Sequence, residues 1–131
     1  MLLVIIYAPN NNQNKFYKDL HEKIVEMGQD NICIVGDLNA VVDIRKDYFS
    51  SVKNKKKRKI LPRSFFKMTH ELNFIDQWRR INLGKKEFTF YSNPHKSWSR
   101  LEMAWMNAKL GNQLDTIEIM TNVWADDNPL K

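Results

Sequence analysis

The sequence predicts an α/β fold, and three segments near the N-terminus carry this prediction. Residues 2–7 are a nearly continuous apolar run closed by a proline turn, the pattern of a central strand. Residues 32–35 are a second apolar run, rich in Ile. Between the runs, an Asn-rich loop and Gly28 bracket a segment with apolar residues at helical spacing: Phe16, Leu20, Ile24 and Met27. A helical crossover of this length implies a parallel strand pair or a layered α/β arrangement.

Length and charge set the bounds on domain number and partner. The chain has 131 residues, which is one domain at most, and 43% hydrophobic residues, which is enough for a core. The net charge of +6 favours a polyanionic partner without requiring one. The single cysteine, Cys33, lies in an apolar run and is expected to be a buried thiol in a reducing compartment. The opening apolar run is too short for a signal peptide or a membrane span, so we expect a nuclear or cytoplasmic protein without a membrane partner.

A polar segment, Gly36-Asp37-Leu38-Asn39, follows the second apolar run directly. A strand period of two places Asp37 and Asn39 on one side and turns Leu38 into the core. Open α/β sheets tend to bind ligands at such strand ends. Asp37 could orient or deprotonate a water there, and the Asn39 amide could donate to a phosphoryl oxygen. The same four residues also suit a simple turn, and the sequence leaves both interpretations open.

The composition changes from Asp43 to Arg63, where apolar residues become sparse. A basic loop is predicted at about residues 50–61, and six of seven consecutive residues in it are cations: Lys53, Lys55, Lys56, Lys57, Arg58 and Lys59. Such a block repels itself and is expected to be solvated. It could bind a nucleic-acid backbone or act as a nuclear-localisation patch, and it could equally be a charged loop without a dedicated partner.

The second half of the chain predicts further helices and strands. Pro62 suits the first turn of a helix that runs to about Leu72. Residues 74–81 carry a packing set with two arginines, Arg79 and Arg80, that are expected to face outward. Strands are then predicted over residues 87–92, 98–106 and 116–120. A short helical connection is predicted over residues 107–112, between the last two of these strands.

Within residues 98–106, a period of two places Arg100 and Glu102 on the same face. The two side chains are therefore expected to lie together. The alternative is an ordinary surface ion pair, worth less than about 1 kcal/mol.

Five motifs occur in the order and rough spacing of one protein family. They are Ile6-Tyr7-Ala8-Pro9-Asn10, Gly36-Asp37-Leu38-Asn39, Phe88-Thr89-Phe90-Tyr91-Ser92, Trp98-Ser99-Arg100-Leu101-Glu102 and Trp124-Ala125-Asp126-Asp127-Asn128-Pro129. Over essentially its whole length, the chain resembles the endonuclease domain of LINE-type retrotransposons, within the endonuclease/exonuclease/phosphatase superfamily. This resemblance implies a four-layered α/β sandwich that cuts DNA phosphodiesters with Mg²⁺.

The resemblance also implies roles for individual residues. Tyr7 is similar to the tyrosine that contacts the scissile phosphate, and Asp37 and Asn39 to the pair that handles the attacking water and the phosphate. Arg100 matches an arginine of the Ser-Arg-Ile-Asp motif and is a candidate nucleic-acid contact. Asp126 matches the aspartate of the last motif and is the candidate metal ligand.

Departures from the family pattern predict an incomplete catalytic site. Glu102 and Asp127 stand where the family has an Asp-His pair, and a second carboxylate cannot donate a hydrogen bond without first taking up a proton. Asp47-Tyr48 departs from a nearby Asp-Arg. The N-terminal half of the sandwich, with its metal-binding Glu, has no counterpart before Met1, and the last strand is missing, so Mg²⁺ binding is expected to be weak and hydrated.

Three functions are compatible with this pattern. The first is a retrotransposon-derived fragment of a Mg²⁺-dependent DNA endonuclease with weak or no activity. The second is a non-catalytic nucleic-acid- or protein-binding remnant that uses the basic loop, and the third is a product without a selected function. In each case half of a sandwich leaves an apolar sheet face and strand edges uncovered, which predicts self-association.

Overall fold

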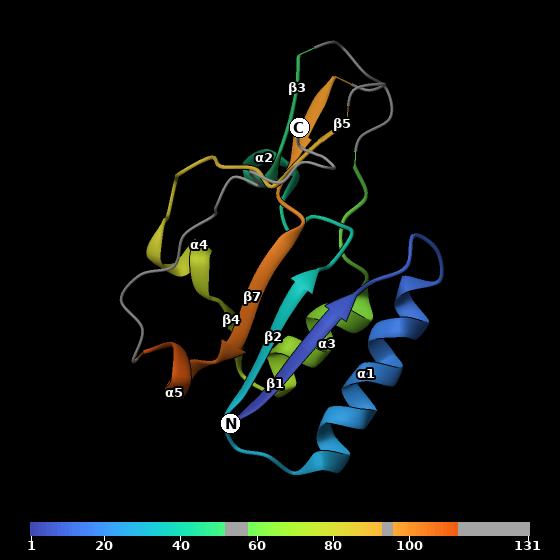
Figure 1. Ribbon diagram of the computed structural model, residues 1–131, viewed down its shortest axis with the longest axis vertical. Helices are drawn as coiled ribbons and strands as arrows, with labels where there is room; N and C mark the ends of the chain where they lie inside the picture. Colours follow the sequence, from blue (N-terminus) through green and yellow to red (C-terminus); the bar gives the residue numbers. More distant parts are fainter. Residues whose placement is uncertain (52–57, 93–95, 113–131) are drawn as a thin grey trace.

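The computed structural model describes residues 1–51, 58–92 and 96–112 (Figure 1). Several residues singled out in the sequence lie outside these ranges: Lys53, Lys55, Lys56, Lys57, Asp126 and Asp127. The strand predicted over residues 116–120 lies outside them as well.

A four-stranded sheet forms the centre of the molecule. Its strands are β1 (Leu2–Tyr7), β2 (Ile32–Asp37), β4 (Phe74–Asp76) and β7 (Glu102–Asn107), in the order β1-β2-β7-β4. β1 and β2 are parallel, which confirms the prediction, and both other pairings are antiparallel. The prediction that β1 is a central strand is wrong within the described chain. β1 lies at the sheet edge, and Leu3 and Ile5 on its outer face are 52% and 75% exposed.

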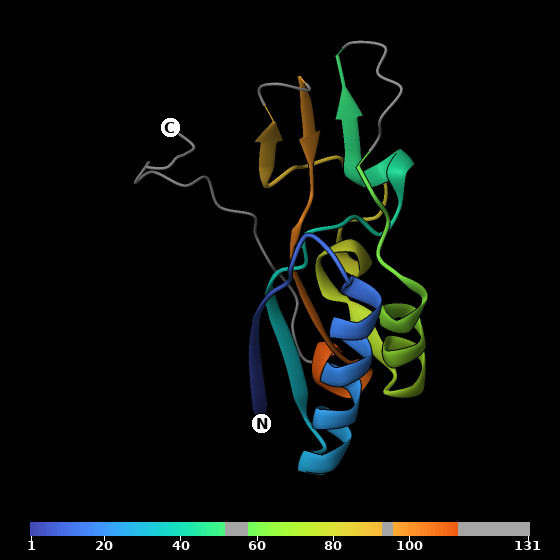
Figure 2. The same cartoon turned by 90° about the vertical axis from the view of Figure 1, so that its right-hand side faces the viewer.

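Two helices, α1 (Gln13–Met27) and α3 (Arg63–Glu71), cover one face of this sheet (Figure 2). They meet β1, β2 and β7 in one apolar core that includes Ile6, Ile34, Phe65 and Trp105. Both helices were predicted, and Gly28 ends α1 in the left-handed conformation, as expected. The prediction that Met27 belongs to the apolar face of this helix is wrong, because Met27 is 52% exposed. The buried face of α1 contains Tyr17 and Ile24 instead.

A smaller sheet extends from one end of the central sheet. It contains β3 (Tyr48–Ser50), β5 (Phe90–Ser92) and β6 (Ser97–Ser99), in the order β3-β6-β5. The single strand predicted over residues 98–106 is therefore two strands, β6 and β7, which belong to different sheets. The chain changes sheets at Arg100 and Leu101, a point that alternation of residue types does not reveal.

Three short helices complete the described chain: α2 (Ile44–Asp47), α4 (Gln77–Ile81) and α5 (Ala108–Gly111). α5 confirms the predicted connection. α2 and β3 fall in the region where apolar residues become sparse and were not predicted, because pairing with β6, rather than local sequence, holds β3 in place. Within the described part of the chain, no helix is long and apolar enough to cross a bilayer.

Candidate functional site

Strand register aligns three of the predicted site residues in a row. Tyr7 of β1 pairs with Asp37 of β2, and Asp37 pairs with Glu102 of β7. Directly paired residues of neighbouring strands place their side chains on the same face of a sheet. Tyr7 is 81% exposed, Asp37 is half-buried and Glu102 is exposed, so the row is open to a ligand.

Hydrogen bonds from both side chains and backbone groups hold the turn after β2. Asp37 Oδ1 accepts the backbone N–H of Asn39 at 2.8 Å, and Asn39 takes up the left-handed conformation with φ 55°. The Leu38 side chain is fully buried, as predicted, and its N–H donates to the carbonyl of Leu101 at 2.9 Å. From the core, the Tyr17 hydroxyl donates to the carbonyl of Leu38 at 2.9 Å. The polar segment is thus a turn that also fixes the Asp37 carboxylate.

Asn39 joins this turn to the end of β1. Its Nδ2 donates to the carbonyl of Ala8 at 3.2 Å and to Asn10 Oδ1 at 2.6 Å. Gln13, at the start of α1, donates from Nε2 to the carbonyls of Pro9 (2.9 Å) and Asn39 (3.0 Å). The carboxamide of Asn39 therefore binds two loops together at the edge of the site.

The basic run reaches the site through its last two residues. Arg58 is half-buried, and its Nη2 contacts the side-chain oxygen of Asn39 and lies 3.5 Å from the Asn39 carbonyl. Its guanidinium carbon lies 5.7 Å from the centre of the Phe90 ring. Lys59 is exposed and contacts the carbonyl of Asn10. The expectation of a solvated loop is wrong for Arg58, because Asn39 in the turn after β2 and the Phe90 ring of β5 supply it with partners that composition cannot show.

Burial and charge shift the protonation of both carboxylates in the row. Burial raises the pKa of Asp37, although the Asn39 N–H and the Arg58 charge oppose the rise. Burial and the neighbouring Asp37 raise the pKa of Glu102. Burial lowers the pKa of Arg58, and Asp37 opposes this effect. Among the described residues, the site is a carboxylate pair in partly desolvated surroundings with the Arg58 cation beside it.

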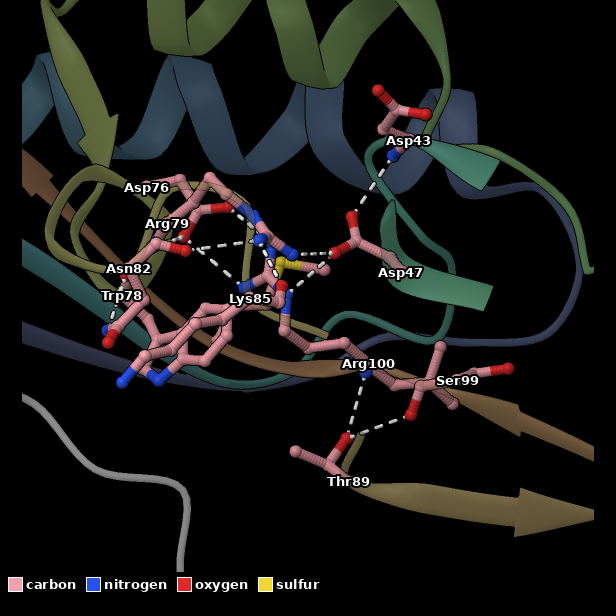
Figure 3. Close-up of polar contacts among 12 residues, drawn as sticks. Asp43, Asp47, Asp76, Trp78, Arg79, Asn82, Lys85, Thr89, Ser99 and Arg100 are labelled. Atoms are coloured by element: carbon pink, nitrogen blue, oxygen red, sulfur yellow. Dashed lines mark hydrogen bonds and ion pairs between the residues drawn. The ribbon is translucent and has the colours of Figure 1, made fainter. Parts of the chain in front are cut away.

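Arg100 lies in a different place from the one predicted. Its side chain is 1% exposed and extends toward the carboxylates of Asp47 and Asp76 (Figure 3), whereas Glu102 is exposed. Its Nε donates to Asp47 Oδ1 at 2.9 Å and its Nη2 to Asp76 Oδ2 at 2.6 Å. Arg79 also faces inward, contrary to expectation, and its Nη2 donates to Asp47 Oδ1 at 2.8 Å. Arg100 and Glu102 are thus separated because the chain changes sheets between them.

This network links the two sheets beneath the site. The Arg100 N–H donates to the carbonyl of Asp47 at 2.9 Å, next to the side-chain pair. The guanidinium groups of Arg79 and Arg100 lie 4.8 and 5.3 Å from the Trp78 ring centre. Burial alone would raise the pKa of Asp47, but hydrogen bonds from Arg100, Arg79 and the Asp43 N–H, together with the charge of Arg100, outweigh it and lower that pKa.

Sequence reasoning missed several residues that build the site. Thr89 Oγ1 accepts the N–H groups of Leu101 at 2.9 Å and Glu102 at 3.2 Å, which fixes the start of β7. Asp76 caps α4 by accepting the Arg79 N–H at 3.3 Å, and an acidic residue between an apolar pair and a short helix is a signal for such a cap. No comparable local signal marks Asp47 as the partner of Arg100.

The described residues contain no group of three or more potential metal-ligating side chains. They do offer the Asp37 and Glu102 carboxylates side by side. Mg²⁺ is commonly held by one or two carboxylates and several waters, so this pair fits a hydrated magnesium ion and no closed metal cage.

Comparison with known proteins places the fold in a class. No family model matches the sequence. The structure is similar to the 3'-5' exonuclease NExo from Neisseria meningitidis, with a TM-score of 0.67 and 15% identity over 84% of this chain and 50% of that chain. It is also similar to a 3' phosphatase NExo variant from Neisseria bound to a product DNA hairpin, with a TM-score of 0.65 and 15% identity over 84% and 49%.

The chain therefore has a mixed α/β fold of the endonuclease/exonuclease/phosphatase type, and it spans about half the length of these solved structures. At this identity the likeness concerns the fold and not the chemistry. The prediction of a partial α/β fold of this type is confirmed.

Proposed function

We propose that this chain is a retrotransposon-derived, LINE-type half of a Mg²⁺-dependent DNA phosphodiesterase that retains slow hydrolysis of DNA phosphodiester bonds. The observation that carries the proposal is the alignment of Tyr7, Asp37 and Glu102 across three neighbouring strands. Each belongs to a separate motif of the family resemblance, and the fold brings the motifs to one end of the sheet.

Asp37 is the proposed base that orients and deprotonates the attacking water. Its carboxylate is held by the Asn39 N–H at 2.8 Å, and burial raises its pKa, which makes the carboxylate a better proton acceptor. The exposed Tyr7 hydroxyl would donate a hydrogen bond to a phosphate oxygen. Mg²⁺, held by Glu102 with Asp126 as a further ligand, would supply charge stabilisation for the phosphoryl oxygens.

The chain is expected to be slow because the last motif carries Asp127 where the family has histidine. Loss of a positioned acid-base group commonly costs about 10²–10⁴-fold in rate. A double variant, Glu102→Asp with Asp127→His, supplied with the N-terminal half of a related endonuclease in trans, is therefore expected to nick DNA faster than the unmodified chain.

Nicking of supercoiled plasmid with Mg²⁺ at low salt tests the proposal directly. We expect slow nicking by the natural chain and a loss of about 10²–10⁴-fold in Asp37→Ala. Asp30→Ala is the matched control, since Asp30 is an exposed residue between α1 and β2. Equal nicking by all three proteins would reject the assignment of Asp37. Salt-sensitive DNA binding by a folded chain that does not nick would support the non-catalytic binding function instead.

A further inference from the structure

The carboxylate row creates an electrostatic problem for a phosphodiester substrate. Asp37 and Glu102 are directly paired across β2 and β7, and the charge of Asp37 already raises the pKa of Glu102. A phosphate group that approaches Asp37 therefore meets two negative charges. Phosphate binding at this site therefore requires positive charge close to the carboxylates, and a side-chain cation can share this role with the proposed Mg²⁺.

Arg58 is the described cation whose charge acts on Asp37. It is held on two sides, by Nη2 on the Asn39 side chain and by the Phe90 ring at 5.7 Å. A half-buried guanidinium with fixed contacts loses less freedom on binding an anion than an exposed lysine does. Arg58 is thus a preorganised cation at the strand ends.

One donor of Arg58 has no acceptor in the described structure. Its Nε is buried and has no hydrogen-bond partner among the described residues. A buried N–H without an acceptor is costly, and a hydrogen bond from a charged donor to a phosphate oxygen is stronger than one between neutral groups. The Asn39 amide, by contrast, already donates to Ala8 and Asn10, so the spare donor at this turn belongs to Arg58.

We propose that Arg58 binds the phosphate group of the DNA substrate through its Nε–H, and that Asn39, which accepts from Nη2, and the Phe90 ring position it for this role. This inference rests on the proposed function, because the phosphodiester is its ligand. It separates Arg58 from the rest of the basic run: Arg58 would contact the phosphate at the reacting position, whereas an exposed residue such as Lys59 would add general attraction to the DNA backbone.

Salt-dependent DNA binding tests this role. Binding of a fluorescein-labelled DNA duplex is measured by anisotropy over a series of salt concentrations, with EDTA present to prevent cleavage. Arg58→Gln is expected to bind about tenfold more weakly. The slope of log Kd against log salt is expected to fall by about 0.9, which is the change for the loss of one phosphate contact. Arg63→Gln is the matched control, because Arg63 is an exposed residue at the start of α3, on the helix-covered side of the sheet.

Arg58→Lys distinguishes phosphate binding from a purely structural role and remains informative if Arg58→Gln fails to fold. Lysine keeps the charge but loses the Nε–H donor and the planar guanidinium that Asn39 and Phe90 hold, so we expect weaker binding with an unchanged salt slope. Binding by Arg58→Lys as tight as that of the natural chain would overturn the inference. A salt slope for folded Arg58→Gln equal to that of Arg63→Gln would also overturn it.

The two proposals fail in different ways. If the natural chain nicks DNA through Asp37 and Arg58→Gln nicks and binds like Arg63→Gln, only the role of Arg58 is wrong. If the chain does not nick DNA but the salt slope still depends on Arg58, the hydrolytic function is wrong and Arg58 remains a phosphate-binding residue.

Discussion

Arg100 Nε and Asp47 Oδ1 lie 2.9 Å apart, and each of the two side chains has only 1% of its surface exposed. The pair joins the end of α2 to the point where the chain passes from β6 to β7. Because β7 carries Glu102 and pairs with Asp37, this buried contact supports the geometry of the candidate site from beneath.

Removal of the Asp47 charge is expected to destabilise the fold strongly. Asp47→Asn leaves Arg100 and Arg79 in a buried position with one carboxylate, Asp76, in place of two. Breaking a buried pair in this way costs about 3–5 kcal/mol. Urea unfolding followed by circular dichroism measures the change, and Asp30→Asn, at an exposed position, should stay within about 0.5 kcal/mol. A loss below about 1 kcal/mol for Asp47→Asn would show that the network is energetically unimportant.

Gly36→Ala tests the close contact between β1 and β2 just before Asp37. Gly36 has φ 135°, and a Cβ there would lie 2.0 Å from the carbonyl oxygen of Ile6. We expect a loss of about 3 kcal/mol or more, since both the backbone strain and the overlap with main-chain atoms must be relieved.

Gly84→Ala is the control for Gly36→Ala. Gly84 also has a positive φ, 82°, but nothing lies within 4 Å of its added Cβ. Only the backbone strain remains there, at about 1–2 kcal/mol. Equal losses for the two variants in urea unfolding would contradict the proposed steric cause.

The pH dependence of stability should have opposite signs at Asp37 and Asp47. The folded-state pKa of Asp37 is raised, so its contribution to stability is present at low pH and is lost as pH rises through that pKa. The pKa of Asp47 is lowered, so its contribution is present above the unfolded-state pKa and is lost as pH falls through the folded-state value.

Asp37→Asn is therefore expected to raise Tm at neutral pH and to leave it unchanged in strong acid. Thermal melts over a pH series, compared with Asp30→Asn, measure this difference. A neutral-pH Tm below that of the natural chain would show that the Asp37 charge stabilises the fold, contrary to the direction of its pKa shift.

Self-association through the outer sheet face, which no helix of the described residues covers, is predicted to depend on Ile5. Leu3 and Ile5 project from the outer face of β1, where they are 52% and 75% exposed, and β1 is an edge strand of the described sheet. Ile5→Lys is expected to shift the chain toward monomer in sedimentation velocity experiments. Val25→Lys is the control, because Val25 is 57% exposed on α1. Equal effects of the two substitutions would locate the association elsewhere.

Local patterns in the sequence were sufficient for α1, for β2 and for the turn that follows β2. The apolar run of β2, the helical spacing in α1 and the termination at Gly28 each reflect neighbours in the chain, so they could be predicted without a structure. The Asp37 turn with Leu38 in the core follows from the same periodicity.

Elements that depend on distant partners could not be predicted in this way. β3 is three residues long and is held by β6, some fifty residues away, and the strand predicted over residues 98–106 divides where its two parts join different sheets. The prediction that Arg100 and Glu102 lie together was wrong for this reason: a period of two holds only within one strand.

By itself, the sequence determined the class of fold and the candidate motifs, because both follow from the order of residue types. It also determined the surplus of positive charge, which follows from composition. Only the tertiary structure decided which charged side chains meet: Arg100 with Asp47 and Asp76 in the interior, and Arg58 with Asn39 at the strand ends. The physical reason is that ion pairing depends on strand register and burial, which arise when segments far apart in the chain come together.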